Sequence, residues 1–306
     1  MKLTQKRAPN AGFTLVEAIV VIAIIGIIGA IVAVFIRLPV QNYANSVARA
    51  EVTDEADLAL RRMAREIRLA LPNSIRVISD GSGSSGSAIE FLLTKTGGRY
   101  LSSDDPNPTS LPPLDFINTA NTSLTVVGTL TQPVAVNDYF VVYNLGSAMA
   151  PSDAWGSSTG GSNIAQIAAV TGTVWPTLTL KSNPFASQNP PMPSPGNRFQ
   201  IVSGPVMFAC APAGDGALVL TRYSGYSINA TMTTPPTNAT SAAPLTRRVS
   251  SCKGLFTYDT SDGTTSSAQR TSLVSLALEL AARTTAGTAA TTSIRLVHQV
   301  HVDNTP

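Results

Sequence analysis

The residues best placed to do chemistry lie near the N-terminus, where one acid precedes a long apolar run. Glu17 is the only charged side chain between Arg7 and Arg37, and the nineteen residues of 18–36 that follow it are all apolar. At 1.5 Å per helical residue this run spans about 28 Å, close to the hydrocarbon thickness of a bilayer. A carboxylate there costs roughly 2.5–3.5 kcal/mol at the bilayer centre and less near its edge, so a cationic partner is expected. The chemistry expected of Glu17 is ion pairing inside a membrane.

The segment before this run is short and basic. It contains Lys2, Lys6 and Arg7 and no acid. By the positive-inside rule it stays in the cytoplasm, which places the chain after Arg37 across the membrane. A secretory signal would have a small-residue cleavage site after its apolar core. Here the core is followed by residues 37–39 (Arg-Leu-Pro), and the small residue, Gly12, precedes it.

The stretch Gly12-Phe13-Thr14-Leu15-Val16-Glu17 resembles the processing motif of type IV pilins and type II secretion pseudopilins. The resemblance implies that a prepilin peptidase cuts between Gly12 and Phe13 on the cytoplasmic face, and that Phe13 is then N-methylated. It also implies that Glu17, fifth in the mature chain, pairs with the N-terminal amine of a neighbouring subunit during assembly. That amine would be the missing cation. The alternative is an ordinary membrane anchor with one stray acid.

The basic sequence pI of about 9.0 comes from the leader. Residues 1–12 hold three of the 21 Lys and Arg and none of the 18 Asp and Glu, so the remaining chain is formally neutral. A nucleic-acid-binding protein needs a basic face that contacts phosphates. The charge balance therefore argues against nucleic acid as a partner.

Two cysteines, Cys210 and Cys252, lie on the expected periplasmic side. In an oxidising compartment they are expected to form a disulfide, whose loop closure is worth about 4 kcal/mol in the chain-entropy model. The alternative is a zinc site completed by His298 and His301. If residues 293–302 form a strand, those two side chains point to opposite faces, which favours the disulfide.

No arrangement of nucleophile and base is evident, and the His-Glu-x-x-His and ATP-binding P-loop motifs are absent from the sequence. We therefore expect neither catalytic residues nor a cofactor, and any motor must be a separate ATPase. Acidic turns at Asp104-Asp105, Asp215 and Asp259–Asp262 could hold calcium, and the last resembles the start of an EF-hand loop without its later ligands. Turn formation explains these acids more simply.

A continuous helix is predicted from Thr14 to Leu71, about 87 Å long, with a kink at Pro39. Beyond the apolar run its apolar residues recur at helical spacing. This predicted stripe contains Val52, Ala56, Ala59, Leu60, Met63, Ile67 and Ala70. Acids cluster at 51–57 and arginines at 61–68, with Asp57 and Arg61 as a favourable i,i+4 pair. The charges suit a solvated face, or recognition between the acidic and basic segments of neighbouring subunits.

From Ser74 onward, short β-like runs alternate with Gly, Pro, Ser and Asn. The expected strands are 74–78, 89–94, 124–127, 139–143, 164–170, 173–180, 199–202, 206–210, 217–223, 255–258, 273–280 and 293–302. The last two are expected to form an antiparallel hairpin with His298 in an apolar row. Long connections are expected at 80–87, 101–116, 144–163, 182–198 and 228–244. The fold class is therefore α+β, with a long N-terminal helix packed on an antiparallel β-rich C-terminal domain.

A second resemblance lies further along the chain. Residues 58–68 (LALRRMAREIR) with Leu71-Pro72-Asn73 resemble the helix end of J-type minor pseudopilins of type II secretion. Residues 220–225 (LTRYSG), 256–258 (FTY) and 298–306 (HQVHVDNTP), with the two cysteines, resemble the MshO-type minor pilin of the mannose-sensitive haemagglutinin pilus. Residues 100–200 match neither. Many major pilins have a helix-breaking proline where this chain has Val34.

These observations predict a cleaved leader (1–12), a transmembrane half-helix (13–39), a periplasmic amphipathic half-helix (40–71) and a β-rich domain (72–306). The resemblance implies a single-pass inner-membrane protein with a periplasmic domain, later moved to a pilus on the cell surface. Its expected partners are prepilin peptidase, other major and minor pilins, an inner-membrane assembly platform and a separate ATPase. The predicted function is a minor type IV pilin acting in initiation or at the tip. The alternatives are a type II secretion pseudopilin and a tip adhesin, the last motivated by long loops near Trp155 and Trp175.

Overall fold

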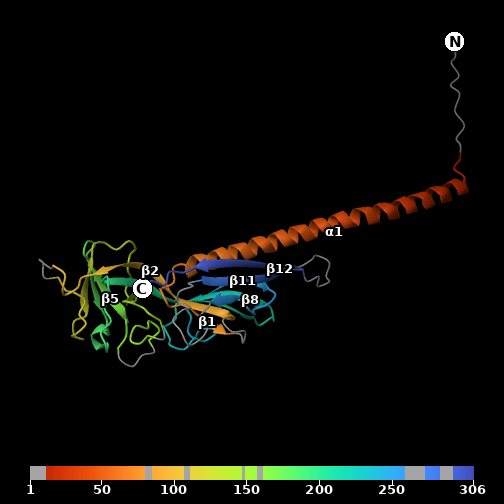
Figure 1. Ribbon diagram of the computed structural model, residues 1–306. Coiled ribbons are helices and arrows are strands. Elements are labelled where there is room, and N and C mark those ends of the chain that lie inside the picture. The colour runs from red at the N-terminus through yellow and green to blue at the C-terminus, as the bar shows by residue number, and fades with distance from the viewer. Residues whose placement is uncertain are drawn as a thin grey trace, which may run out of the picture. The chain divides into compact units, whose positions relative to one another are not determined.

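The computed structural model describes residues 12–79, 85–106, 111–146, 149–156, 161–258, 273–282 and 292–306. Within them, one long helix, α1 (Leu15–Ile67), precedes a domain built from antiparallel strands (Figure 1). This confirms the α+β class. The chain divides into two compact units between Glu51 and Val52, so that the last part of α1 belongs with the strands.

Helix α1 continues through Pro39 without a break and ends four residues earlier than expected. After Ile67 the chain turns, and Ala70 forms an isolated antiparallel bridge with Leu93. Leu71 N–H donates to the Leu92 carbonyl at 2.8 Å, which ties the end of the helical segment to the sheet. Every member of the predicted apolar stripe is buried, which confirms that periodicity.

The described residues form twelve strands, of which β2 and β7 are the longest. They are β1 (Arg76–Ser79), β2 (Ser85–Tyr100), β3 (Ser123–Val127), β4 (Tyr139–Val141), β5 (Ile164–Thr171), β6 (Thr177–Leu180), β7 (Arg198–Pro212), β8 (Leu218–Ser224), β9 (Ser241–Val249), β10 (Phe256–Tyr258), β11 (Leu273–Ala282) and β12 (Thr292–His301). One 3-10 turn, η1 (Phe185–Ser187), interrupts a long connection.

Strands β2 and β7 pair with each other and organise two rings of strands. One ring runs β2-β10-β11-β9-β8-β7, and its core contains the buried stripe of α1; we call it, with β1 and β12, the helix lobe. The other runs β2-β7-β4-β5-β6-β3 around Phe140, Phe185 and Phe199; we call it the second lobe. Figure 1 shows β5 at one end of this domain and β8, β11 and β12 at the other.

The pairing of the two long strands is irregular where they pass from one lobe to the other. Their register shifts between Leu92 and Thr94, opposite Ser203 and Gly204. Gly204 has φ of +129°, a conformation that favours glycine. In the second lobe, a Cβ on Gly98 would lie 3.1 Å from the Phe199 ring, so the absence of a side chain lets that ring pack against the strand.

The expected hairpin of β11 and β12 is present, with ten consecutive residue pairs from Leu273–His301 to Ala282–Thr292. Its basis is the alternation of β11, in which Val274, Leu276, Leu278 and Leu280 are fully buried. Among the strands that the structure describes, β9 alone is wholly unexpected: it occupies the end of the connection expected at 228–244 and continues to Val249. The strands expected at 199–202 and 206–210 are one strand, β7, joined through the bulge at Gly204.

Candidate functional site

The predicted processing site lies directly before the first turn of α1. Gly12 has open space around its Cα, and Phe13 is 73% exposed. The Glu17 N–H donates to Thr14 Oγ1 at 3.3 Å, so Thr14 caps the helix in a Thr-x-x-Glu arrangement. The same six residues thus form the helix start, a local role that the motif alone does not reveal. The rest of the predicted leader, residues 1–11, lies outside the described residues.

The segment that follows is an apolar helix that the described residues leave exposed. In the described part of the chain, α1 is long and apolar enough to cross a membrane: its most apolar 18-residue window has a mean hydropathy of 3.3, and none of that window is buried within the chain. Large apolar side chains are exposed on every side of it, for example Ile24, Ile28 and Ile31. Contiguous apolar surface of this extent requires lipid or other apolar helices around it.

Glu17 lies at the beginning of this apolar surface. Its side chain is exposed, and no cation among the described residues pairs with it. Because burial of an unpaired carboxylate in an apolar environment is costly, the site can accept a cationic group from outside the described chain. Accessible backbone at Gly12 and Phe13, followed one turn later by this carboxylate, is therefore the arrangement that the site offers.

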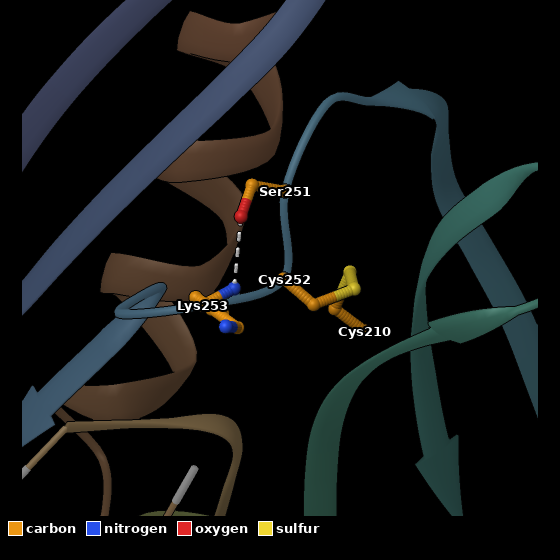
Figure 2. The surroundings of a disulfide bond; sticks show 4 residues. All are labelled: Cys210, Ser251, Cys252 and Lys253. Carbon is orange, nitrogen blue, oxygen red and sulfur yellow. Dashed lines mark hydrogen bonds between the residues drawn. A yellow bond between two sulfur atoms is a disulfide. The ribbon is translucent and has the colours of Figure 1, made fainter. Parts of the chain in front are cut away.

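The two cysteines form a disulfide with a Cα–Cα distance of 5.4 Å. Figure 2 shows Cys210 on β7 and Cys252 on the connection between β9 and β10, where Lys253 N–H donates to Ser251 Oγ at 3.2 Å. Cys210 belongs to the core that buries the α1 stripe, and Cys252 packs against that core. Because the sulfur atoms are joined to each other, they are not available as zinc ligands. His298 is half-buried on β12, and His301 is exposed.

Two of the acidic turns considered for calcium have protein partners. The Asp105 carboxylate accepts from Ser102 N–H and pairs with Arg99, and these interactions hold its pKa below the ordinary value. Asp215 accepts from Ala217 N–H and pairs with Arg247 at 2.8 Å, and its pKa is lowered in the same way. Both acids are therefore accounted for by turn contacts. Asp259–Asp262 lie outside the described residues.

A buried polar cluster that sequence reasoning missed lies beside a cavity of about 290 Å³. Arg76 Nε donates to Glu90 at 2.6 Å, and Tyr226 Oη donates to the other Glu90 oxygen at 2.8 Å. The guanidinium nitrogens of Arg76 also donate to the carbonyls of Asn229 and Ala230, both at 2.7 Å. Burial, and then the Glu90 charge, raise the pKa of Tyr226. Because Arg76 donates to these protein acceptors, the cluster serves to attach the 226–230 segment to the sheet.

The two tryptophans that motivated an adhesin hypothesis differ in accessibility. Trp155 is buried, its indole N–H donates to the Ser74 carbonyl at 3.0 Å, and the Arg76 guanidinium lies 3.6 Å from its ring centroid. Trp175 is 41% exposed in the turn between β5 and β6. Of the two, Trp175 has by far the more exposed side chain.

Comparison with known proteins gives one match. Residues 7–33 match the family described as the prokaryotic N-terminal methylation motif. No curated protein and no solved structure matches the chain, so the J-type and MshO-type resemblances have no relative to support them. The matched segment contains Gly12, Phe13 and Glu17 and ends within the apolar part of α1. The chain therefore carries an N-terminal methylation motif of the type IV pilin kind.

Proposed function

We propose that this chain is a minor type IV pilin, a structural subunit and not an enzyme. It is made as a prepilin, anchored in the inner membrane by the first part of α1, and cut by prepilin peptidase between Gly12 and Phe13. Phe13 is then N-methylated. The mature protein is assembled with other pilins by an inner-membrane platform and a separate ATPase, and it acts in initiation or at the tip.

The observation that carries this proposal is the continuity of motif and helix. The methylation motif at residues 7–33 leads into a helical surface that is apolar on every side and has Glu17 as its one charge. An N-terminal amine created at Phe13 of a neighbour would be a cation small enough to enter a bundle of such helices. In an ordinary anchor the carboxylate would make membrane insertion less favourable and would have no role to compensate for that cost.

The minor-pilin role, as opposed to a type II secretion pseudopilin, rests on the resemblance of residues 220–225, 256–258 and 298–306 to the MshO-type pilin. Both roles use the same motif and anchor. Neighbouring genes for a pilus or for a secretion system would separate them. An adhesin role has a narrower basis, the exposed ring of Trp175; binding of the wild-type protein but not of Trp175→Ala to a glycan array would favour it.

The direct test of processing is the N-terminus of the mature protein. Intact mass and N-terminal sequencing of protein from membranes should give a chain that begins at N-methyl-Phe13. Gly12→Val should leave the leader attached, because a side chain at this position obstructs seating of the backbone in the peptidase. Ala11→Val is the matched control and should still be cut. A wild-type protein that still begins at Met1, in cells with active peptidase, would reject the proposal.

A further inference from the structure

Strand β12 forms one edge of the helix lobe, and no strand in the described part of the chain pairs with its outer side. It pairs with β11 over ten residues without a register shift, and no other described strand pairs with it. Natural sheets usually protect such edges with short strands, bulges, Pro or Lys. The edge strand β1 follows that rule, since it has four residues and a register shift at Ser79. β12 contains neither Pro nor Lys.

The hydrogen bonds of β11 identify which groups of β12 are free. Ala277 N–H donates to the Leu255 carbonyl and the Glu279 carbonyl accepts from Ser250 N–H, so these two residues direct their backbone groups away from β12. Their partners in the register are Val297 and Arg295. In an antiparallel pair of this kind, both members point their backbone groups outward.

In an antiparallel pair the direction of the backbone N–H and C=O groups alternates from residue to residue, so the assignment for Arg295 and Val297 extends to the whole of β12. Free N–H and C=O groups at the edge belong to every second residue: Ser293, Arg295, Val297, Gln299 and His301. All five residues are exposed, and no described group bonds to their backbone. The residues between them pair with β11. The edge therefore offers a ladder with the spacing of one extended strand.

The core beneath this edge is also incompletely covered. Leu278 and Leu280 of β11 are fully buried, whereas their partners Leu296 and Ile294 on β12 are only half-buried on the same face. On the opposite face Val297 is 60% exposed. A strand added beside β12 would cover the inner row and pair the free groups in one step.

We propose that β12 is a docking edge for an extended segment of a neighbouring subunit in the filament, a proposal that rests on the pilin function above. An extended strand fits because a helix uses its own N–H and C=O groups internally. The outer row of β12 contains Arg295 and His301 and no acid. The docked segment therefore has apolar residues on its inner face and acidic or polar residues on its outer face.

The test is hydrogen–deuterium exchange of the full-length mature protein, compared between sheared filaments and detergent-solubilised monomer. The amides of Arg295, Val297 and Gln299 should exchange at least about tenfold more slowly in the filament, the effect of one net backbone hydrogen bond near the top of its usual range. The amides of Leu296 and His298, which bond to β11, should be protected in both states and serve as the internal control.

A variant pair tests the same edge by assembly. Val297→Pro removes a free N–H without breaking the ladder to β11, and should reduce incorporation into filaments by about tenfold. Val297→Ala keeps the N–H and should assemble normally. Unchanged exposure of the edge amides in filaments that contain the protein would overturn this proposal alone. A dimer of the purified protein that depends on Val297 would reassign the edge to self-association and also overturn it. Absence of the wild-type protein from filaments would overturn the pilin function as well.

Discussion

In residues 18–36, helix α1 is apolar on every side, whereas from Val52 to Ile67 its apolar residues, apart from the exposed Leu58, form a single stripe. The first part exposes its side chains, as at Ile28, and the second buries them, as at Met63. The two parts of one helix therefore differ in what they require. The stripe packs in a core formed with strands of its own chain, while the first part is left exposed by the described residues and needs an apolar environment.

The difference teaches that the angular distribution of apolar residues, and not their number, indicates the partner of a helix. A stripe corresponds to one packed face, and a complete apolar surface corresponds to lipid or to several surrounding helices. Glu17 belongs to the second kind of surface, so its partner is expected from another molecule. Substitutions in the two parts should consequently affect different measurements.

The largest expected effect is loss of the disulfide, which lies in the core that buries the stripe. Replacing Cys210 and Cys252 together by serine should lower the free energy of unfolding by about 4 kcal/mol, because the unfolded chain regains the entropy of the open loop. Denaturant unfolding of the β-rich domain measures this, with membrane insertion as the unaffected control. Both thiols found free in protein from the periplasm would contradict the bridge.

A smaller effect is expected from cavity formation in the stripe. Met63→Ala should destabilise the domain by about 3 kcal/mol, since Met63 is fully buried. The matched substitution Ile28→Ala, in the exposed part of α1, should leave unfolding of the domain unchanged and reduce only the apolar surface of the anchor. If Met63→Ala and Ile28→Ala destabilised the domain equally, residues 18–36 would also pack on their own chain. The two parts of α1 would then not differ as described.

The smallest effect concerns the solvent-facing charges of the second part. Asp57 and Arg61 form the expected i,i+4 pair at 2.7 Å, with both side chains substantially exposed. Asp57→Asn should therefore cost only about 0.3–0.5 kcal/mol, and less at high salt. If it instead abolished assembly at unchanged stability, the pair would belong to a contact between subunits.

Sequence reasoning succeeds here where the pattern is local. The buried stripe of α1, the pairing of Asp57 with Arg61 and the β11–β12 hairpin each follow from residue types at a fixed spacing. The oxidising compartment and the expected strand around His298 favour pairing of the cysteines, and the structure joins them. The motif at Gly12–Glu17 is also a local pattern, and it lies within the segment that matches a known family motif.

The features that escape prediction depend on distant contacts. Strand β9 contains Pro244 and the pair Arg247-Arg248, and its position follows from its pairing with β8. Strand β2 continues past the expected end at Thr94 through Gly97 and Gly98, which resemble a turn until the Phe199 ring is placed against them. The partners of Glu90 lie at positions 76 and 226, so no local pattern could indicate this buried acid.

The measurement that tests the central claim most directly is the distribution of Glu17→Val between inner membranes and sheared filaments. Removing the charge should leave membrane insertion intact or improved, and cleavage after Gly12 should continue. Incorporation into filaments should fail, because the amine of the neighbouring Phe13 would be buried without its counter-charge. The account predicts processed, membrane-bound, unassembled protein, with wild-type and Thr14→Ser proteins assembling as controls. Full incorporation of Glu17→Val at normal abundance would contradict it.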